Sequence, residues 1–298
     1  MAGRWRVMAV AAVLALAGCT TGSAGSTGSP GEPTPTPIPS DVLAGLSVEV
    51  RQARSDWALR VVQLRVTNAG PGDVTVARAR LVTPDDEGVA TSDRERPVRA
   101  GVDRDVSVAL GHPVCDDAAS GPARAELDLV DAAGRRSTLT VEPADPQGHL
   151  ARIHGEDCAA AAVAAGASLN LADAITTRDA GGTLAADVVL EVVPVAGGPR
   201  VQITQVDGTV LLAPVGGATA WPTDVDTADG AVDAVPLELV PSRCDPHAVA
   251  EDKRGTFFGV HASVDGVAQP VFYLASSDAL RGALHEFVGR SCGMPGAG

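Results

Sequence analysis

The segment from Asp245 to Arg254 carries the densest set of side chains that could bind or react. It directly follows Cys244 and precedes an apolar run at 257–264. Charged and imidazole groups in a loop next to a fixed cysteine are suited to contacting a protein partner. The residues that we expect to make such contacts are Asp245, His247, Glu251, Asp252, Lys253 and Arg254. The alternative, which charge runs generally favour, is a helical turn whose charges face water.

Trp221 is a second candidate for partner binding. It stands between Ala220 and Pro222 in a segment that has the composition of a loop, so we expect an exposed aromatic anchor. Phe257, Phe258 and Phe272 lie in apolar runs instead, and we expect them in a core.

Three aspartates near Gly230 have some of the spacing of a calcium loop. An EF-hand places acids at alternate positions and a glutamate at its twelfth position. Here Asp224 and Asp226 fit, Asp229 is one residue late, and the twelfth position is Val235. The pattern favours a solvated acidic turn, with calcium at the three aspartates as the weaker alternative.

Known catalytic patterns are missing from the sequence. Lys253 is the single lysine, and Ala250 stands where a Ser-x-x-Lys pair would need serine. There is no Gly-x-Ser-x-Gly motif and no phosphate loop ending in Lys-Ser or Lys-Thr. His285-Glu286 begins like a zinc-protease helix, but Gly289 occupies the place of the second histidine. We therefore expect a non-enzymatic protein with no metal centre and no cofactor.

The first nineteen residues read as an export segment. Arg4 and Arg6 precede an apolar run at 7–17, which is shorter than the roughly 20 residues that span a bilayer. The run ends in Leu16-Ala17-Gly18-Cys19, which resembles the lipobox of bacterial lipoprotein precursors. The resemblance covers only this segment. It implies removal of residues 1–18 and attachment of lipid to Cys19, which would anchor the chain on the extracytoplasmic face of the cell membrane.

Composition places a spacer after the lipid site and limits the partners. Residues 19–40 are mostly Thr, Ser, Gly and Pro, which cannot form a core and predict a semi-rigid tether. The chain has 23 basic and 37 acidic residues, a formal net charge of −14. Nucleic acid is therefore not an expected partner, because binding it needs clustered cations.

Four cysteines remain after Cys19, and an internal repeat predicts how they pair. Outside the cytoplasm an even set is expected to be oxidised. The residues before and after Cys115 match those around Cys244, and a Leu-x-x-apolar-x-Gly-x-x-Cys pattern ends at both Cys158 and Cys292. The repeat predicts a duplicated domain with the bonds Cys115–Cys158 and Cys244–Cys292.

Strand patterns define the fold that is duplicated. Alternating or continuous apolar runs separated by Gly/Pro turns occupy 46–50, 59–67, 74–82, 106–110, 125–130 and 139–141, then 184–193, 201–206, 209–212, 235–240, 257–264 and 270–274. They predict a mainly β protein with two tandem immunoglobulin-like antiparallel β-sandwich domains, at 41–158 and 159–298. A helix is expected at 278–288, capped by Ser277 or Asp278, with a shorter one at 150–155. The stretch 159–166 is expected to be a linker or an early first strand.

These features favour a membrane-anchored binding or scaffold module of the envelope, whose partner is an envelope protein or a wall component. The alternative is a small-molecule or metal-binding lipoprotein with a site between the domains, lined by histidines or by Asp245, His247 and Glu251. An enzyme of unrecognised type is the third reading, and it would need a carboxylate or histidine with a shifted pKa in a deep cleft.

Overall fold

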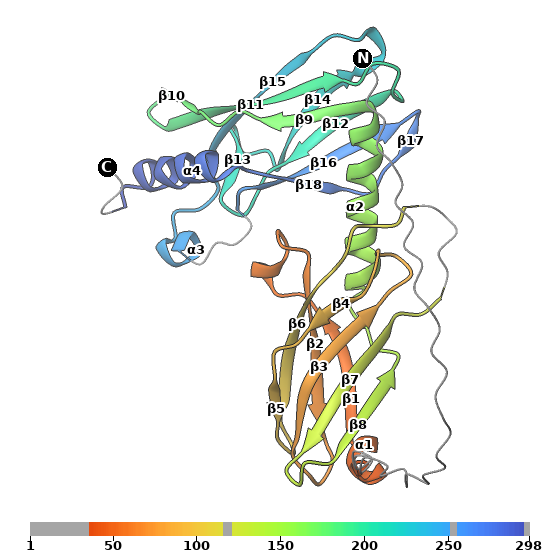
Figure 1. Cartoon of the computed structure of the whole chain (residues 1–298). Helices are drawn as coiled ribbons and strands as arrows, with labels where there is room; N and C mark the ends of the chain where they lie inside the picture. Colours follow the sequence, from red (N-terminus) through yellow and green to blue (C-terminus); the bar gives the residue numbers. More distant parts are fainter. Residues whose placement is uncertain (1–35, 116–120, 251–254, 295–298) are drawn as a thin grey trace, which may run out of the picture. The chain divides into compact units, whose positions relative to one another are not determined.

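The computed structural model describes residues 36–115, 121–250 and 255–294 (Figure 1). The chain divides into two units, Met1–Pro35 and Thr36–Gly298, and every described residue belongs to the second. The export segment, the lipobox and most of the tether lie outside the described residues. Within the described part, no helix is long and apolar enough to cross a membrane.

Strands β1 to β8 form two antiparallel sheets that we call the first sandwich (Figure 1). One sheet has the order β1-β2-β6, and the other has the order β4-β3-β7-β8 with β5 also paired to β3. The strands are β1 (Leu46–Arg51), β2 (Val61–Asn68), β3 (Val74–Val82), β4 (Ala90–Ser92), β5 (Arg96–Val98), β6 (Asp103–Ala109), β7 (Arg124–Asp131) and β8 (Arg136–Val141).

Alternation of apolar residues holds the two sheets of the first sandwich together. In β2 every second residue is buried, so Val62, Leu64 and Val66 all face one core. Buried residues of both sheets join in that core, and each fully buried Val or Leu side chain contributes about 1.5–3 kcal/mol relative to exposure. One polar residue, Asn68, is also fully buried. Its amide donates to the carbonyl oxygens of Gly72 (2.9 Å) and Val98 (3.1 Å).

Strands β9 to β18 form the second sandwich in the same way. One sheet has the order β10-β11-β15-β13 with β9 also paired to β11, and the other has the order β14-β12-β16-β17 with β18 also paired to β16. The strands are β9 (Ala167–Leu171), β10 (Thr176–Asp179), β11 (Leu184–Pro194), β12 (Val201–Asp207), β13 (Leu212–Pro214), β14 (Ala220–Asp226), β15 (Asp233–Pro241), β16 (Phe257–Val264), β17 (Val267–Ala268) and β18 (Phe272–Ala275).

The two sandwiches repeat one topology. In each, a path of three hydrogen-bonded antiparallel strands lies in one sheet, and a central antiparallel pair lies in the other. Thus β1-β2-β6 corresponds to β9-β11-β15, and the pair β3-β7 corresponds to β12-β16. Two packed antiparallel sheets with these shared pairings are immunoglobulin-like, and their repetition confirms the fold predicted from the sequence.

Both disulfides pair as predicted and occupy equivalent places. Cys115, after β6, bonds to Cys158, and the Cα atoms are 5.4 Å apart. Cys244, after β15, bonds to Cys292, with a Cα separation of 5.3 Å. In each copy the second cysteine lies at a helix that follows the last strand: α2 (His149–Gly166) or α4 (Asp278–Ser291).

Helix α4 confirms the helix expected at 278–288 and extends it to Ser291. The Ser277 hydroxyl accepts from the backbone N–H of Leu280 (3.1 Å), so Ser277 is the cap. The apolar face that the spacing predicted, Leu280, Leu284, Phe287 and Val288, is buried in the core of the second sandwich.

Helix α2 corrects the expectation for 150–166. The sequence suggested a short helix at 150–155 and a linker or strand at 159–166, whereas one helix runs from His149 to Gly166. Alanine has the highest helix propensity, so the alanine run extends the helix that Asp145 begins by accepting from the N–H groups of His149 and Leu150. Ile153 joins the first core and Val163 the second, so the proposed boundary at 158/159 falls inside this helix.

The folded body also begins earlier than position 41. Ile38 is only 3% exposed and joins the first core, and its N–H donates to Ser137 Oγ (2.9 Å). The carbonyl oxygen of Thr36 accepts from the N–H of Arg136. A short helix, α1 (Ser40–Ala44), then leads into β1. Residues 36–40, predicted as tether, are therefore part of the body, because Ile38, the apolar residue among the prolines, packs in the first core.

Candidate functional site

The loop after β15 contains a helix that Asp245 begins. Helix α3 (Pro246–Ala250) starts with the Asp245 carboxylate accepting from the N–H of His247 (2.9 Å). The side chains of Asp245 and His247 are exposed. The predicted contact residues Glu251, Asp252, Lys253 and Arg254 lie outside the described residues, so partner binding there stays a prediction. The helical turn that was the alternative for this segment is present at α3.

The expectation of an exposed Trp221 is wrong. Trp221 is 7% exposed, and its Nε1–H donates to the carbonyl oxygen of Glu238 (2.8 Å). The ring centroids of Trp221 and Phe258 are 6.1 Å apart. Both residues belong to the second core, and Phe258 is fully buried. The reason is that 220–226 is a strand, β14, and not a loop. This strand is at the edge of its sheet, where Pro222 is tolerated.

Two of the three aspartates considered for calcium, Asp226 and Asp229, have other partners. The Asp226 carboxylate forms an ion pair with Arg200 and accepts from the N–H of Ala228 (3.0 Å). The hydrogen bond from Arg200 holds the pKa of Asp226 well below its ordinary value. Asp229 accepts from the N–H of Ala231. Among the described residues, no three His, Cys, Asp or Glu side chains are grouped so that they could hold a metal ion.

A hollow of about 530 Å³ lies in the second sandwich, between the β11–β12 turn and the segment after β14. Its lining is mostly turn residues, including Pro194, Gly198, Pro199 and Gly230. Arg200 is its one cation and is already paired with Asp226. No histidine lines it. It therefore differs from the pocket between the domains, lined by histidines or by Asp245, His247 and Glu251, that the small-molecule alternative predicts.

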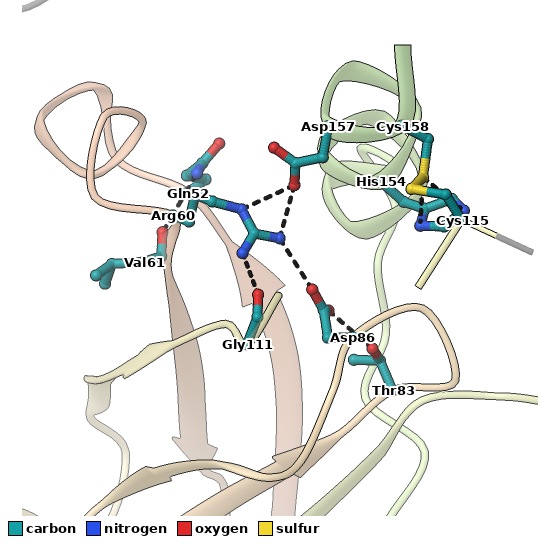
Figure 2. A network of polar contacts seen from close by, with 10 residues as sticks. All are labelled: Gln52, Arg60, Val61, Thr83, Asp86, Gly111, Cys115, His154, Asp157 and Cys158. Atoms are coloured by element: carbon teal, nitrogen blue, oxygen red, sulfur yellow. Dashed lines mark hydrogen bonds and ion pairs between the residues drawn. A yellow bond between two sulfur atoms is a disulfide. The ribbon is translucent and has the colours of Figure 1, made fainter. Parts of the chain in front are cut away.

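Arg60 is the centre of a polar network in the first sandwich, which the sequence did not reveal (Figure 2). Its guanidinium donates to Asp157 Oδ2 (2.8 Å), to Asp86 Oδ1 (3.0 Å) and to the carbonyl oxygen of Gly111. Asp86 also accepts from the hydroxyl of Thr83 (2.8 Å). The charged side chains are largely buried, being 26% exposed for Arg60, 12% for Asp86 and 22% for Asp157.

This network is a clamp, because each of its groups comes from a different segment. Arg60 precedes β2, Asp86 follows β3, Gly111 follows β6 and Asp157 is on α2. Arg60 has a φ of 48°, in the left-handed region that costs a non-glycine residue about 1–3 kcal/mol. That conformation aims the side chain at both carboxylates. The clamp fixes α2 and the segment after β6 on the end of the sandwich.

The Cys115–Cys158 disulfide lies beside the clamp, and a histidine lies against it (Figure 2). Nδ1 and Nε2 of His154 are each 3.7 Å from Cys158 Sγ. The two residues are four apart on α2, a spacing that places side chains on one helix face. That spacing is visible in the sequence, but it could not be used while a helix was expected to stop at 155. Arg60, Asp86 and Asp157 had no local signal of this kind.

The described fold defines a tandem immunoglobulin-like sandwich protein. No protein-family model matches the chain, and no curated protein matches it. Among solved structures, an inhibited exo-β-D-glucosaminidase is 14% identical, with 76% of this chain and 26% of that chain covered and a TM-score of 0.20. Red sea bream transglutaminase is 12% identical, with 78% and 31% covered and a TM-score of 0.23. An exo-chitosanase from Amycolatopsis orientalis is 12% identical, with 76% of this chain and 26% of that chain covered and a TM-score of 0.19.

The chain spans about a quarter to a third of the length of these three proteins. TM-scores this low do not define a shared fold. The architecture therefore rests on the strand order and disulfides described above, and no activity is transferred from these structures.

Proposed function

We propose that this chain is a lipoprotein anchored through Cys19 on the extracytoplasmic face of the cell membrane. The observation that carries the proposal is Leu16-Ala17-Gly18-Cys19 at the end of a short apolar run behind Arg4 and Arg6. Two disulfides in equivalent places support it, because such bonds persist in oxidising compartments outside the cytoplasm. Two acyl chains at one cysteine would give stable anchoring.

The body acts, in this proposal, as a non-enzymatic binding or scaffold module for an envelope protein or a wall component. The support is the second sandwich, which presents the loop after β15 from a disulfide-bonded cysteine. Asp245 and His247 are exposed there, and α3 is short and pinned at Cys244. Binding residues are disproportionately found on loops that a rigid scaffold positions in this way.

Membrane fractionation tests the anchor. The Cys19→Ala variant removes the lipid acceptor, so the chain should move from the membrane fraction and lose incorporation of a labelled fatty acid. Thr20→Ala is the matched control and should stay labelled at the membrane. Labelling of Cys19→Ala at the wild-type level would contradict the proposal.

Crosslinking at the native membrane tests the binding role. Replacing Asp252, Lys253 and Arg254 together by alanine should remove at least 90% (about ten-fold) of a specific crosslinked product, which corresponds to about 1.4 kcal/mol in affinity. Arg94→Ala with Glu95→Ala is the control, because both are exposed in the first sandwich. An unchanged yield with the triple variant would reject the loop as the contact surface.

A further inference from the structure

The two disulfides are matched in topology but differ in their immediate surroundings. Cys115 and Cys244 are both exposed, and Cys158 and Cys292 are both half-buried. Four residues before the helical cysteine, the first copy has His154 and the second has Val288, which is fully buried. The histidine lies 3.7 Å from Cys158 Sγ, whereas the polar contact of Cys292 Sγ is the carbonyl oxygen of Arg243 at 3.9 Å.

That difference matters when a disulfide is broken. Thiol–disulfide exchange is faster when the departing sulfur is better stabilised as a thiolate. An imidazolium beside the sulfur stabilises the thiolate, and cysteines next to a protonated histidine are the reactive ones. A carbonyl oxygen has the opposite effect, since its partial negative charge faces the departing sulfur.

The clamp would keep the first sandwich in place after such a cleavage. Arg60 holds Asp157 of α2 and the carbonyl oxygen of Gly111 without help from the sulfurs. Leu150 and Ile153 of α2 pack on the first core. Opening the bond therefore releases Cys115 from α2, while the helix stays attached and residues 112–114 keep their hydrogen bonds to 85–87.

We propose that Cys115–Cys158 is a redox-labile site for thiol–disulfide exchange with dithiols, and that Cys244–Cys292 is a structural bond. This goes beyond the proposed function. A dithiol thiolate attacks the exposed Cys115 Sγ and forms a new S–S bond, while the Cys115–Cys158 bond breaks and its electron pair leaves on Cys158 beside His154. The second thiol of the dithiol, deprotonated, then displaces Cys115. The dithiol is oxidised to a disulfide, the cysteines are reduced, and its two protons pass to solvent and to the cysteine thiols.

Timed partial reduction of the full chain in detergent tests the proposal. The oxidised protein is incubated with dithiothreitol under native conditions, quenched with an alkylating reagent and analysed cysteine by cysteine by mass spectrometry. The bond Cys115–Cys158 should open about ten-fold faster than Cys244–Cys292 in the same molecules. His154→Gln, which keeps a polar side chain but has no imidazole to accept a proton, should slow the opening of the first bond several-fold and leave the second unchanged.

His112→Ala is the matched control, because His112 is exposed and three residues from Cys115. It should change neither rate. Thiolate absorbance gives a second readout: the selectively reduced wild type should show it at neutral pH and His154→Gln should show less. Circular dichroism shows whether both variants fold. If His154→Gln does not fold, His154→Asn replaces it. Equal rates for the two bonds, or an unchanged first rate in His154→Gln, would overturn the proposal.

Discussion

Asn68 illustrates how single residues decide the interior of the first sandwich. It is fully buried, and its Oδ1 accepts from the N–H of Gly70 (3.0 Å) while its amide donates to two carbonyl oxygens. These bonds give partners to backbone groups of Gly70 and Gly72 in the tight turn between β2 and β3, and to the carbonyl oxygen of Val98. Gly45 lies against that turn so closely that a Cβ there would be 2.4 Å from Gly70 Cα.

Replacing Asn68 by alanine should therefore destabilise the protein by about 2–4 kcal/mol, because three backbone groups lose buried partners. Urea unfolding followed by circular dichroism measures the effect. Asn170→Ala is the control, since Asn170 is exposed on β9 and should change stability by less than about 0.5 kcal/mol. Equal effects of the two substitutions would show that the Asn68 bonds are not needed.

The Arg200–Asp226 pair makes stability depend on pH. The hydrogen bond from Arg200 lowers the pKa of Asp226 below its ordinary value of 3.8. A lowered carboxyl pKa stabilises the fold above the unfolded value, and that contribution is lost as the pH falls through the folded value. Wild type should exceed Asp226→Asn in unfolding free energy at pH 7, and the difference should shrink below about pH 4. Denaturant titrations across this range measure it, and a constant difference would contradict it.

Among the helices and strands, α2 differs most from what the sequence predicted. An alanine run carries no alternation and no cap, so it was compatible with a linker. Tertiary packing decides that the run is helical, because Ala159 and Val163 are buried in the second core. The helix ends at Gly166, where a Cβ would come within 2.2 Å of the carbonyl oxygen of Pro199.

Two substitutions at the exposed Ala161 distinguish a helix from a linker. Ala161→Gly should cost about 1 kcal/mol and Ala161→Pro about 3 kcal/mol or more, because proline breaks a helix interior. A linker would tolerate both. Urea unfolding gives the values, with Ala132→Gly in the exposed β7–β8 turn as the control. Two near-zero values at position 161 would contradict a continuous helix.

Long strands were predictable because their burial alternates over many residues. Strands β3 and β16 have the predicted bounds, β1, β11 and β12 are longer by one residue, and β7 is longer by one residue at each end. The short edge strands β4, β5, β10 and β17 were missed, since two to four residues hold no readable period. Strand β14 was missed because Pro222 indicated a loop, and the error in placing Trp221 followed from that.

At the scale of the whole molecule, the internal repeat was the strongest signal in the sequence. It linked cysteines 43 and 48 residues apart, and both bonds are present. The candidate sites were harder to predict. Arg60, Asp86 and Asp157 meet only through the fold, and the redox contrast between the two bonds needed the helix that carries His154 and Cys158.

Each disulfide should also stabilise its own sandwich. Removing Cys244–Cys292 with two serines should cost about 3–4 kcal/mol, the value that chain entropy assigns to a closed loop of this size. The first sandwich should retain its unfolding midpoint, because its core and clamp are separate. Calorimetry of the full chain can resolve the two transitions, and a loss confined to the first sandwich would contradict the assignment.

The anchor proposed for this tandem sandwich is a lipid on Cys19. Mass spectrometry of the N-terminal peptide from protein purified out of its own membranes tests the claim most directly. The expected peptide begins at Cys19 and carries a thioether-linked diacylglycerol. A peptide that begins at Met1, or one in which Cys19 is an unmodified thiol, would contradict the claim.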